Sequence, residues 1–382
     1  MVEVSEVEEG DLVVRVILTG GGTGGHIYPA LAIAKGLLRH DAETQILYVG
    51  VKDGMEARLV PEVGIAFEGI SGKGLPRRLS WETIKVLGKS LKALWETKNI
   101  LRKFHPDLVI GTGGYVSGPV VLTASLFNYP TVLHEQNALP GITNKILARF
   151  VRRVMVTFPE SMSRFGASKK LELVGLPVRP EIGQVTREVG AKKFGLRPDR
   201  LTLLVTGGSR GALTLNKAMI VVFGHLARHK EIQVIWATGK ETHSQTIKEL
   251  EKRGISWQRP DWRVLEYLED MPEALACADL YIGRAGAASL AELMVAGVPS
   301  ILIPYPYAAE NHQEHNAQAL VQIGAAQIIL DSECDGERLW KEIEGLMSQP
   351  KQLTTMGVAA QTLAQPQALN KIVALCREIA WH

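Results

Sequence analysis

The feature that most constrains the fold is a glycine-rich turn after an apolar strand, and it occurs twice. Residues 13–19 form an apolar, β-branched run that ends in glycine-rich residues 20–25, and an amphipathic segment follows at 29–39. The same order recurs where residues 201–206 run into GGSRGA at 207–212. A strand that turns tightly into a helix is the repeating unit of parallel sheets covered by helices on both faces. The sequence therefore predicts two doubly wound units.

Further apolar runs extend both units. We expect strands at 45–49, 108–111, 131–134 and 154–157 in the first half, and at 233–236, 280–282 and 300–303 in the second. The Gly- and Pro-rich stretch 175–180 is typical of a linker. We predict an α/β protein with two Rossmann-like doubly wound domains that face a cleft. The expected parts are an acidic extension at 1–11, domains at 12–175 and 176–360, and a C-terminal helix within 361–382 that packs back on the first domain.

Composition limits the class of protein. Hydrophobic residues make up 46% of the 382 and charged residues 22%, which excludes a disordered chain. The three cysteines, Cys277, Cys334 and Cys376, are scattered, so we expect a reducing compartment and neither a disulfide framework nor a zinc site. No apolar stretch approaches the ~20 residues that span a bilayer. The acidic N-terminus is unlike a secretory signal, so we expect a cytosolic protein whose membrane contact is peripheral.

Charge is unevenly distributed around a formal net charge of +3. Residues 1–11 carry five acids and no base, whereas residues 12–175 carry 21 Lys and Arg against 12 Asp and Glu. Residues 176–382 are nearly neutral, with 22 bases against 23 acids. A basic first domain favours an anionic partner, such as a phosphate, a nucleic acid or an acidic membrane surface.

The first glycine loop is the strongest local signal for chemistry. Gly20, Gly22 and Gly25 fit the pattern GxGxxG after a strand, but the acid that completes a dinucleotide site is displaced to Asp53. The loop is not a P-loop, because no Gly-Lys-Ser/Thr follows. We interpret the bare backbone as room for a diphosphate or a sugar, with the titratable His26 beside it. The alternative is a tight turn in which His26 only caps the helix.

Three motifs in the second half suit a nucleotide-sugar. In the 207–212 loop, Ser209 is a candidate phosphate donor and Arg210 adds charge, although an ordinary turn is an equal alternative. The small residues at 284–291 lead to Glu292, whose carboxylate suits ribose hydroxyls or, alternatively, a helix dipole. The polar stretch 311–317 suits sugar hydroxyls. A metal pair at His312 and His315 is less favoured, because no third ligand and no Asp-x-Asp is present.

Residues 71–105 form a basic amphipathic segment with nine Lys and Arg and two acids. Apolar side chains recur at helical spacing, while lysines take another face; the apolar set is Trp81, Ile84, Leu87, Leu91, Leu94 and Trp95. Such a helix can lie on an anionic bilayer. The alternative is a surface helix whose apolar face packs on the sheet.

Together these motifs resemble the MurG family, the N-acetylglucosaminyltransferases of peptidoglycan synthesis. The matching stretches run in order along most of the chain: TGGGTGGHIYPALAIA (19–34), GTGGYVSGP (111–119), LHEQNALPGITNK (133–145), GLPVRPE (175–181), GGSRGALTLN (207–216), GRAGAASLAEL (283–293) and HQxxNA (312–317). The resemblance implies the two-domain GT-B fold and a metal-independent, inverting enzyme without a cofactor. It also implies GlcNAc transfer from UDP-GlcNAc to the 4-hydroxyl of the MurNAc unit of lipid I, the undecaprenyl-diphosphate-linked acceptor, giving lipid II.

The resemblance also assigns roles to individual residues. His26 is expected to act as the catalytic base. The acceptor side is expected to include Thr23, Gly24, Gly25, Tyr115, Glu135 and Asn137. The UDP-GlcNAc side is expected to include Thr23, Gly25, Asn137, Arg179, Ser209, Leu268 through its backbone, Ser289, Glu292, His312 and Gln313. Many relatives carry Gln at the position of Arg210, and the acidic residues 1–11 lie outside the family pattern.

The expected location is the cytoplasmic face of the bacterial plasma membrane. Expected partners are the two substrates, an anionic membrane surface and candidate cell-wall synthesis proteins, with no nucleic acid. Three alternatives stay open: a transferase that glycosylates a diacylglycerol-type lipid, an NAD-dependent oxidoreductase, and a non-catalytic nucleotide-sugar binding subunit.

Overall fold

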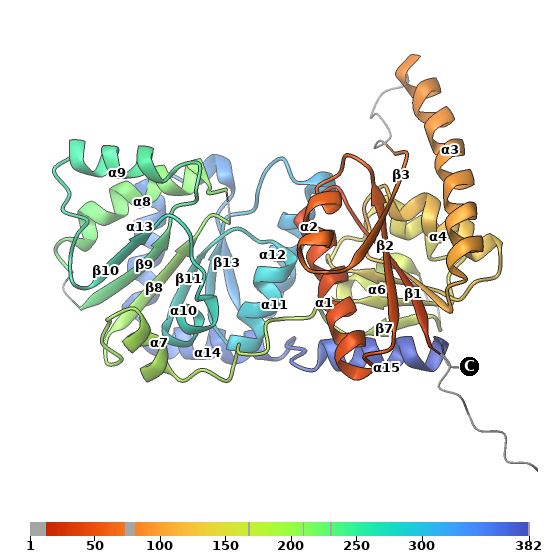
Figure 1. The fold of residues 1–382 in the computed structure, drawn as a ribbon. Helices are drawn as coiled ribbons and strands as arrows, with labels where there is room; N and C mark the ends of the chain where they lie inside the picture. Colours follow the sequence, from red (N-terminus) through yellow and green to blue (C-terminus); the bar gives the residue numbers. More distant parts are fainter. Residues whose placement is uncertain (1–12, 73–80, 167–168, 209, 230, 381–382) are drawn as a thin grey trace, which may run out of the picture.

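The computed structural model describes residues 13–72, 81–166, 169–208, 210–229 and 231–380, without the side chains of 81–90 (Figure 1). The acidic extension 1–11, the basic loop 73–78 and Ser209 therefore lie outside the described residues. Two separate parallel sheets form the cores of two domains.

The N-terminal domain is built on a seven-stranded sheet in the order β3-β2-β1-β4-β5-β6-β7. Its strands are β1 Arg15–Thr19, β2 Gln45–Val51, β3 Ala66–Ile70, β4 Leu108–Gly111, β5 Thr131–Glu135, β6 Arg153–Val156 and β7 Leu171–Leu173. Its helices are α1 Gly24–His40, α2 Glu56–Glu62, α3 Trp81–Phe104, α4 Ser117–Leu126, α5 Ile142–Leu147 and α6 Pro159–Phe165. The central strands are buried on both faces, which explains their continuous apolar runs.

The C-terminal domain is built on a six-stranded sheet in the order β10-β9-β8-β11-β12-β13. Its strands are β8 Leu201–Thr206, β9 Ile232–Ala237, β10 Trp262–Leu265, β11 Leu280–Gly283, β12 Ser300–Leu302 and β13 Ala326–Ile328. Its helices are α7 Arg187–Lys193, α8 Leu213–Leu226, α9 His243–Lys252, α10 Met271–Cys277, α11 Ala287–Ala296, α12 His312–Gln322, α13 Gly336–Met347 and α14 Pro350–Gln361, with 3-10 turns η1 Ala309–Asn311 and η2 Asp331–Glu333.

Strand order fixes where each domain can bind a ligand. In the first sheet the order reverses between β1 and β4, and in the second between β8 and β11. Ligands of open α/β sheets bind at this switch point, beyond the carboxyl ends of the strands. The loops that meet there are 20–23 with 112–116 in one domain, and 207–212 with 284–286 in the other. These are the loops that carry the sequence motifs.

The predicted fold class is confirmed, and the nine predicted strands correspond to the interior strands of the two sheets. The four strands that the sequence did not reveal, β3, β7, β10 and β13, are the four sheet edges. Their residues are mostly half-buried, so they lack the continuous apolar run of an interior strand.

The chain crosses between the domains twice. Residues 174–186 lead from β7 to α7, and residues 362–367 lead back from α14 to α15 (Ala368–Ala380), which lies along the N-terminal domain (Figure 1). Leu369 and Val373 pack against α1 so closely that a Cβ on Gly36 would come within 2.7 Å of Leu369 Cδ1. Ile372 and Cys376 join the core that contains β1. The last helix therefore completes the core of the first domain.

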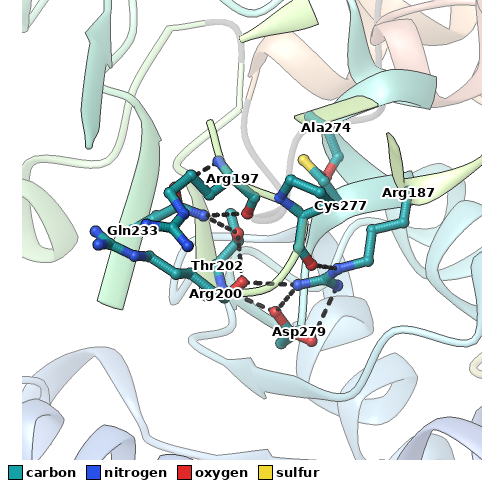
Figure 2. Close-up of polar contacts among 9 residues, drawn as sticks. Arg187, Arg197, Arg200, Thr202, Gln233, Ala274, Cys277 and Asp279 are labelled. Carbon is teal, nitrogen blue, oxygen red and sulfur yellow. Dashed lines mark hydrogen bonds and ion pairs between the residues drawn. The ribbon is translucent and has the colours of Figure 1, made fainter. Parts of the chain in front are cut away.

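A polar network fastens the linker end of the C-terminal domain to its sheet (Figure 2). Arg187, at the start of α7, forms a bidentate pair with Asp279, with Nη1–Oδ1 at 3.0 Å and Nη2–Oδ2 at 2.7 Å. Gln233 on β9 bridges the backbone of Arg197 to Thr202 beside this pair. The linker therefore ends on a rigid support.

Candidate active site between the domains

His26 stands at the switch point of the N-terminal domain, in the first turn of α1. Its Nδ1 lies 3.1 Å from the carbonyl oxygen of Thr112 and 3.1 Å from Gln136 Oε1. Both partners present acceptor oxygens, so Nδ1 carries the proton and Nε2 of the neutral ring carries a lone pair. Gly113 supports the ring, because a Cβ at this position would come within 2.9 Å of His26 Nδ1.

Part of the first glycine run is explained by close packing against other segments of the same domain. A Cβ on Gly20 would lie 2.0 Å from Thr112 Oγ1, and one on Gly21 would lie 2.4 Å from a carboxylate oxygen of the buried Glu56. The N–H groups of Gly21 and Gly22 already donate to Gly113 O and to Glu56 Oε2. Our interpretation that the whole run stays bare for a ligand is therefore wrong for its first residues.

The segment that does face outward is the start of α1. Thr23 and Gly25 are exposed, and the Thr23 side chain makes no capping hydrogen bond. A helix N-terminus offers unpaired N–H groups and a positive dipole end to an anion. Tyr115 borders this turn, since a Cβ on Gly22 would lie 3.2 Å from its ring. Burial and the nearby charge of Glu56 raise the pKa of Tyr115.

Glu135 organises its own loop. Its carboxylate accepts from the backbone and side chain of Asn137, from Gly141 N and from Asn144 Nδ2, at 2.8–3.2 Å. The residue is 2% exposed. Its expected role toward the acceptor is therefore indirect, through the position of Asn137.

Asn137 lies where the two domains touch. Its Oδ1 accepts from Asn316 Nδ2 of α12 at 3.1 Å, and Asn316 Oδ1 accepts from Ala138 N at 2.8 Å. Asn316 Nδ2 also lies 3.2 Å from Ala285 O in the loop after β11. Asn316 is fully buried and ties the loop after β5 of the N-terminal domain to the loop after β11 of the C-terminal domain. The sequence placed Asn316 in a motif without giving it this role.

His312 faces His26 across the junction. Its Nδ1 donates to Ala309 O at 2.8 Å, so in the neutral ring Nε2 is the nitrogen that carries the lone pair. Burial lowers the pKa of His312, and a proton on the nearby His26 would lower it further. Among the described residues, no group of three or more His, Cys, Asp or Glu side chains is arranged to hold a metal ion.

Gln313 is fixed by the loop after β11. Its Oε1 accepts from Ala285 N at 3.2 Å and from Tyr305 N at 2.9 Å. Because the amide oxygen is occupied, the NH₂ group is the part that remains to bind an acceptor such as a sugar hydroxyl.

Two of the predicted donor residues form an ion pair. Arg179 Nε of the linker lies 3.6 Å from Glu292 Oε1 of α11, and the Glu292 side chain is 12% exposed. Burial raises the pKa of Glu292, and the positive charge of Arg179 opposes this shift. Ser289, one turn earlier, hydrogen-bonds the hydroxyl of Tyr281, whose pKa burial raises to about 12.

Leu268 is buried, and its backbone polar groups are unpaired among the described residues. Neither its N–H nor its C=O makes a hydrogen bond within the part of the chain that the structure describes. A buried residue with unpaired backbone groups suits recognition of a planar base by its edge.

In the second glycine loop, as in the first, most of the glycines are required by packing within the protein. Gly207, Gly211 and Gly239 interlock, because a Cβ on each would come within 2.4 Å of backbone in this loop or the neighbouring one. Gly208 has φ +85° and open space around its Cα, so it is the glycine that can approach a ligand. Arg210 pairs with Glu241 at 2.8 Å on the surface.

The sequence missed the residues that hold this site together. Thr112, Gln136 and Asn316 all lie in the recognised motifs, but their role appears only when loops distant in sequence meet. Glu56 is a buried acid in an otherwise ordinary stretch, and no sequence signal identified it.

Comparison with known proteins agrees with this geometry. Residues 16–156 match the glycosyltransferase family 28 N-terminal domain, and residues 202–372 match the family 28 C-terminal domain. A protein of Desulfitobacterium hafniense (strain DSM 10664 / DCB-2) is 68% identical over 96% of this chain and all of its own length. It is named UDP-N-acetylglucosamine--N-acetylmuramyl-(pentapeptide) pyrophosphoryl-undecaprenol N-acetylglucosamine transferase. A protein of the same name from Desulforamulus reducens is 48% identical over 96% of this chain and 98% of its own.

Solved structures agree as well. The crystal structure of Acinetobacter baumannii MurG superposes with a TM-score of 0.76 at 31% identity, covering 96% of this chain and 99% of that one. Two facing domains, each built on a parallel sheet and with the candidate site at their junction, define a GT-B glycosyltransferase. Within that class, the chain belongs to glycosyltransferase family 28 and to its MurG family.

Proposed function

We propose that this chain transfers GlcNAc from UDP-GlcNAc to the MurNAc-pentapeptide carried on undecaprenyl pyrophosphate, forming lipid II. The observation that carries the proposal is the 68% identity, over the whole length of the relative, to a protein named for this reaction. The site supports it, because His26 lies across the domain junction from His312, and the next residue, Gln313, is held by the loop after β11. The lipid acceptor then belongs on the N-terminal domain and the nucleotide-sugar on the C-terminal domain.

The proposed chemistry is a single displacement. The MurNAc 4-hydroxyl oxygen forms a bond to the anomeric carbon while the bond from that carbon to UDP breaks, so the centre inverts. The Nε2 lone pair of His26 takes the hydroxyl proton, since its Nδ1–H is already committed to Thr112 and Gln136. Arg179 supplies a positive charge near the nucleotide, and the departing diphosphate is stabilised by unpaired N–H groups at helix N-termini.

We further propose that the N-terminal domain docks on the cytoplasmic face of the plasma membrane. Neighbouring helices α3, α4 and α5, and the residues just after α4 and α5, expose large apolar side chains, namely Leu91, Trp95, Leu126, Phe127, Ile142, Ile146 and Phe150. Basic residues are interspersed among them, and Lys98 Nζ lies 5.2 Å from the Phe127 ring centroid. An apolar surface with interspersed bases suits an anionic bilayer. No helix in the described ranges has the length and apolar character to cross a membrane.

The experiment combines binding with turnover. Thermal-shift measurements with UDP-GlcNAc, UDP-GalNAc, UDP-glucose and NAD are expected to show selective stabilisation by UDP-GlcNAc. Purified protein supplied with labelled UDP-GlcNAc and a lipid I analogue is expected to form labelled disaccharide lipid, whereas a diacylglycerol acceptor gives none. His26→Ala is expected to keep the thermal shift and lose turnover by about 10²–10⁴-fold. Stabilisation by NAD alone, or product formation that survives in His26→Ala, would contradict the proposal.

A further inference from the structure

A chain of buried hydrogen bonds runs from the linker to His26. His134 Nε2 lies 2.8 Å from Gly175 O, and His134 Nδ1 lies 3.0 Å from Gln136 Nε2. Gln136 Oε1 lies 3.1 Å from His26 Nδ1. His134 is fully buried and Gln136 is 2% exposed, so water does not compete for these bonds.

Each proton in this chain has one allowed place. Burial lowers the pKa of His134 to about 4, so its ring is neutral near neutral pH. Its Nε2 faces a backbone carbonyl and must donate, which makes Nδ1 an acceptor. Gln136 Nε2 donates one hydrogen to that Nδ1 and also lies 2.8 Å from His134 O. Both amide hydrogens are used, so the oxygen of Gln136 is the atom turned toward His26.

We infer that Gln136, oriented by His134, is a positioning residue that fixes the tautomer of His26 and tunes its basicity. The inference rests on the proposed function, in which His26 Nε2 takes the hydroxyl proton. Thr112 contributes the second acceptor through its backbone, which substitution cannot remove. Of the two acceptors that His26 Nδ1 faces, Gln136 is therefore the one that a substitution can remove.

The proposed effect is a change in the pKa of His26, so the other titratable groups around it matter. They are Glu135 and the neutral His134 on the β5 side, His312 and Glu310 across the junction, and Glu56 and Tyr115 behind the glycine loop. Gln136→Glu and Gln136→Met replace none of these groups. Shifts of opposite sign in two variants therefore report on the Gln136 contact itself.

Two substitutions at Gln136 are expected to act in opposite directions. Gln136→Glu places one carboxylate oxygen against Nδ1–H, which stabilises the imidazolium and raises the pKa of His26 by about one unit. The second carboxylate oxygen replaces the amide NH₂ beside His134, so His134 Nδ1 must take a proton to donate to it. The acidic limb of kcat/KM is expected to move to higher pH by the same amount, so activity falls about tenfold only below that limb. Gln136→Met removes an acceptor, which lowers the pKa of His26 and reduces the plateau kcat by about tenfold. His134→Phe, which frees the amide, is expected to shift in the same direction as Gln136→Met but less.

The test uses the full-length protein with ¹⁵N-labelled histidine. NMR titration gives the tautomer and pKa of His26, whose signal is assigned by its loss in His26→Ala, and steady-state kinetics give the pH profile. Gln233→Met is the matched control, because Gln233 is an equally buried glutamine whose side chain bonds Arg197 and Thr202 within the C-terminal domain (Figure 2). Its His26 titration is expected to match wild type.

The outcomes separate the inference from the proposed function. Opposite shifts in Gln136→Glu and Gln136→Met support the inference, and a His26 pKa that is unchanged in both, or shifted alike, overturns it. If Gln136→Met does not fold, the upward shift in Gln136→Glu still decides. Wild-type protein that makes no product overturns the proposed function, while the NMR titrations still test the hydrogen-bond chain.

Discussion

The Glu292 carboxyl group is a buried charge whose protonation state matters for the proposed nucleotide site. Its burial raises its pKa, and Arg179 at 3.6 Å only partly opposes that shift. As the pH falls through the raised pKa, the group takes a proton and loses acceptor capacity for ribose hydroxyls. Donor binding should therefore weaken at a higher pH than an ordinary Glu, with a pKa of about 4.3, would produce.

Replacing Glu292 tests this at the residue scale. Glu292→Gln is expected to raise KM for UDP-GlcNAc about tenfold and to change kcat little, because a ribose contact holds substrate and transition state alike. The rise of KM at acidic pH is also expected to flatten. Steady-state kinetics between pH 5 and 8 measure both, with the exposed Glu251→Gln as control. A loss of kcat at constant KM would place Glu292 in the chemical step instead.

The sequence predicted such residues where a motif carries its own chemistry. Arg179 and Glu292 lie far apart along the chain, yet both were expected on the donor side, and the structure pairs them. Gln136 and Asn316 lay in the same motifs, but their partners belong to other loops, so the sequence could not assign their bonds. The prediction that the first glycine loop makes room for a ligand was wrong for Gly20 and Gly21, which pack against Thr112 and Glu56. The sequence does not show which distant residues a glycine packs against.

At the scale of elements, α3 has more apolar surface than its sheet can cover. The sequence predicted a stripe through Leu91, Leu94 and Trp95, but the face that packs inward carries Ala93, Thr97, Ile100 and Leu101. Leu91 and Trp95 are each 64% exposed. Helical periodicity reveals apolar positions but does not tell which stripe docks when there are two. The exposed stripe is the part that we propose contacts the bilayer.

The exposed apolar face of α3 can be tested by substitution. Leu91→Gln with Trp95→Gln is expected to weaken binding to anionic vesicles at least tenfold, because two apolar anchors of about 2 kcal/mol each are lost. The melting temperature and KM for UDP-GlcNAc should stay at wild-type values, since neither side chain belongs to the core. Vesicle co-sedimentation measures the binding. Val358→Gln, also at an exposed apolar site (60%) but on α14, is the control, and equal losses in both proteins would refute the membrane face.

At the scale of the whole molecule, two covalent crossings, a few polar contacts and an apolar cluster that includes Ala138 and Phe158 hold the domains together. The crossings meet at Gly175, where a Cβ would come within 2.3 Å of Gln365 Cβ. Across the cleft, Asn316 provides the buried bonds to Asn137 and Ala138. A sequence can predict two domains from their repeated strand pattern. It cannot predict how the domains meet, because the contacting residues are 178 positions apart and belong to different sheets.

Asn316 therefore tests whether this junction controls the reaction. Asn316→Ala leaves Ala138 N and Asn137 Oδ1 unpaired in the closed arrangement, at a cost of about 1–3 kcal/mol, whereas water satisfies both groups once the cleft opens. The variant is expected to populate open forms, with a larger radius of gyration by small-angle X-ray scattering and a kcat/KM lowered by about 5–150-fold. Asn216→Ala is the control, because Asn216 is equally buried but bonds only within its own domain, to Thr238, Thr242 and Trp236. Asn216→Ala should lower the melting temperature without enlarging the molecule. If Asn316→Ala gives the same scattering curve as wild type, the Asn316 hydrogen bonds do not set domain closure.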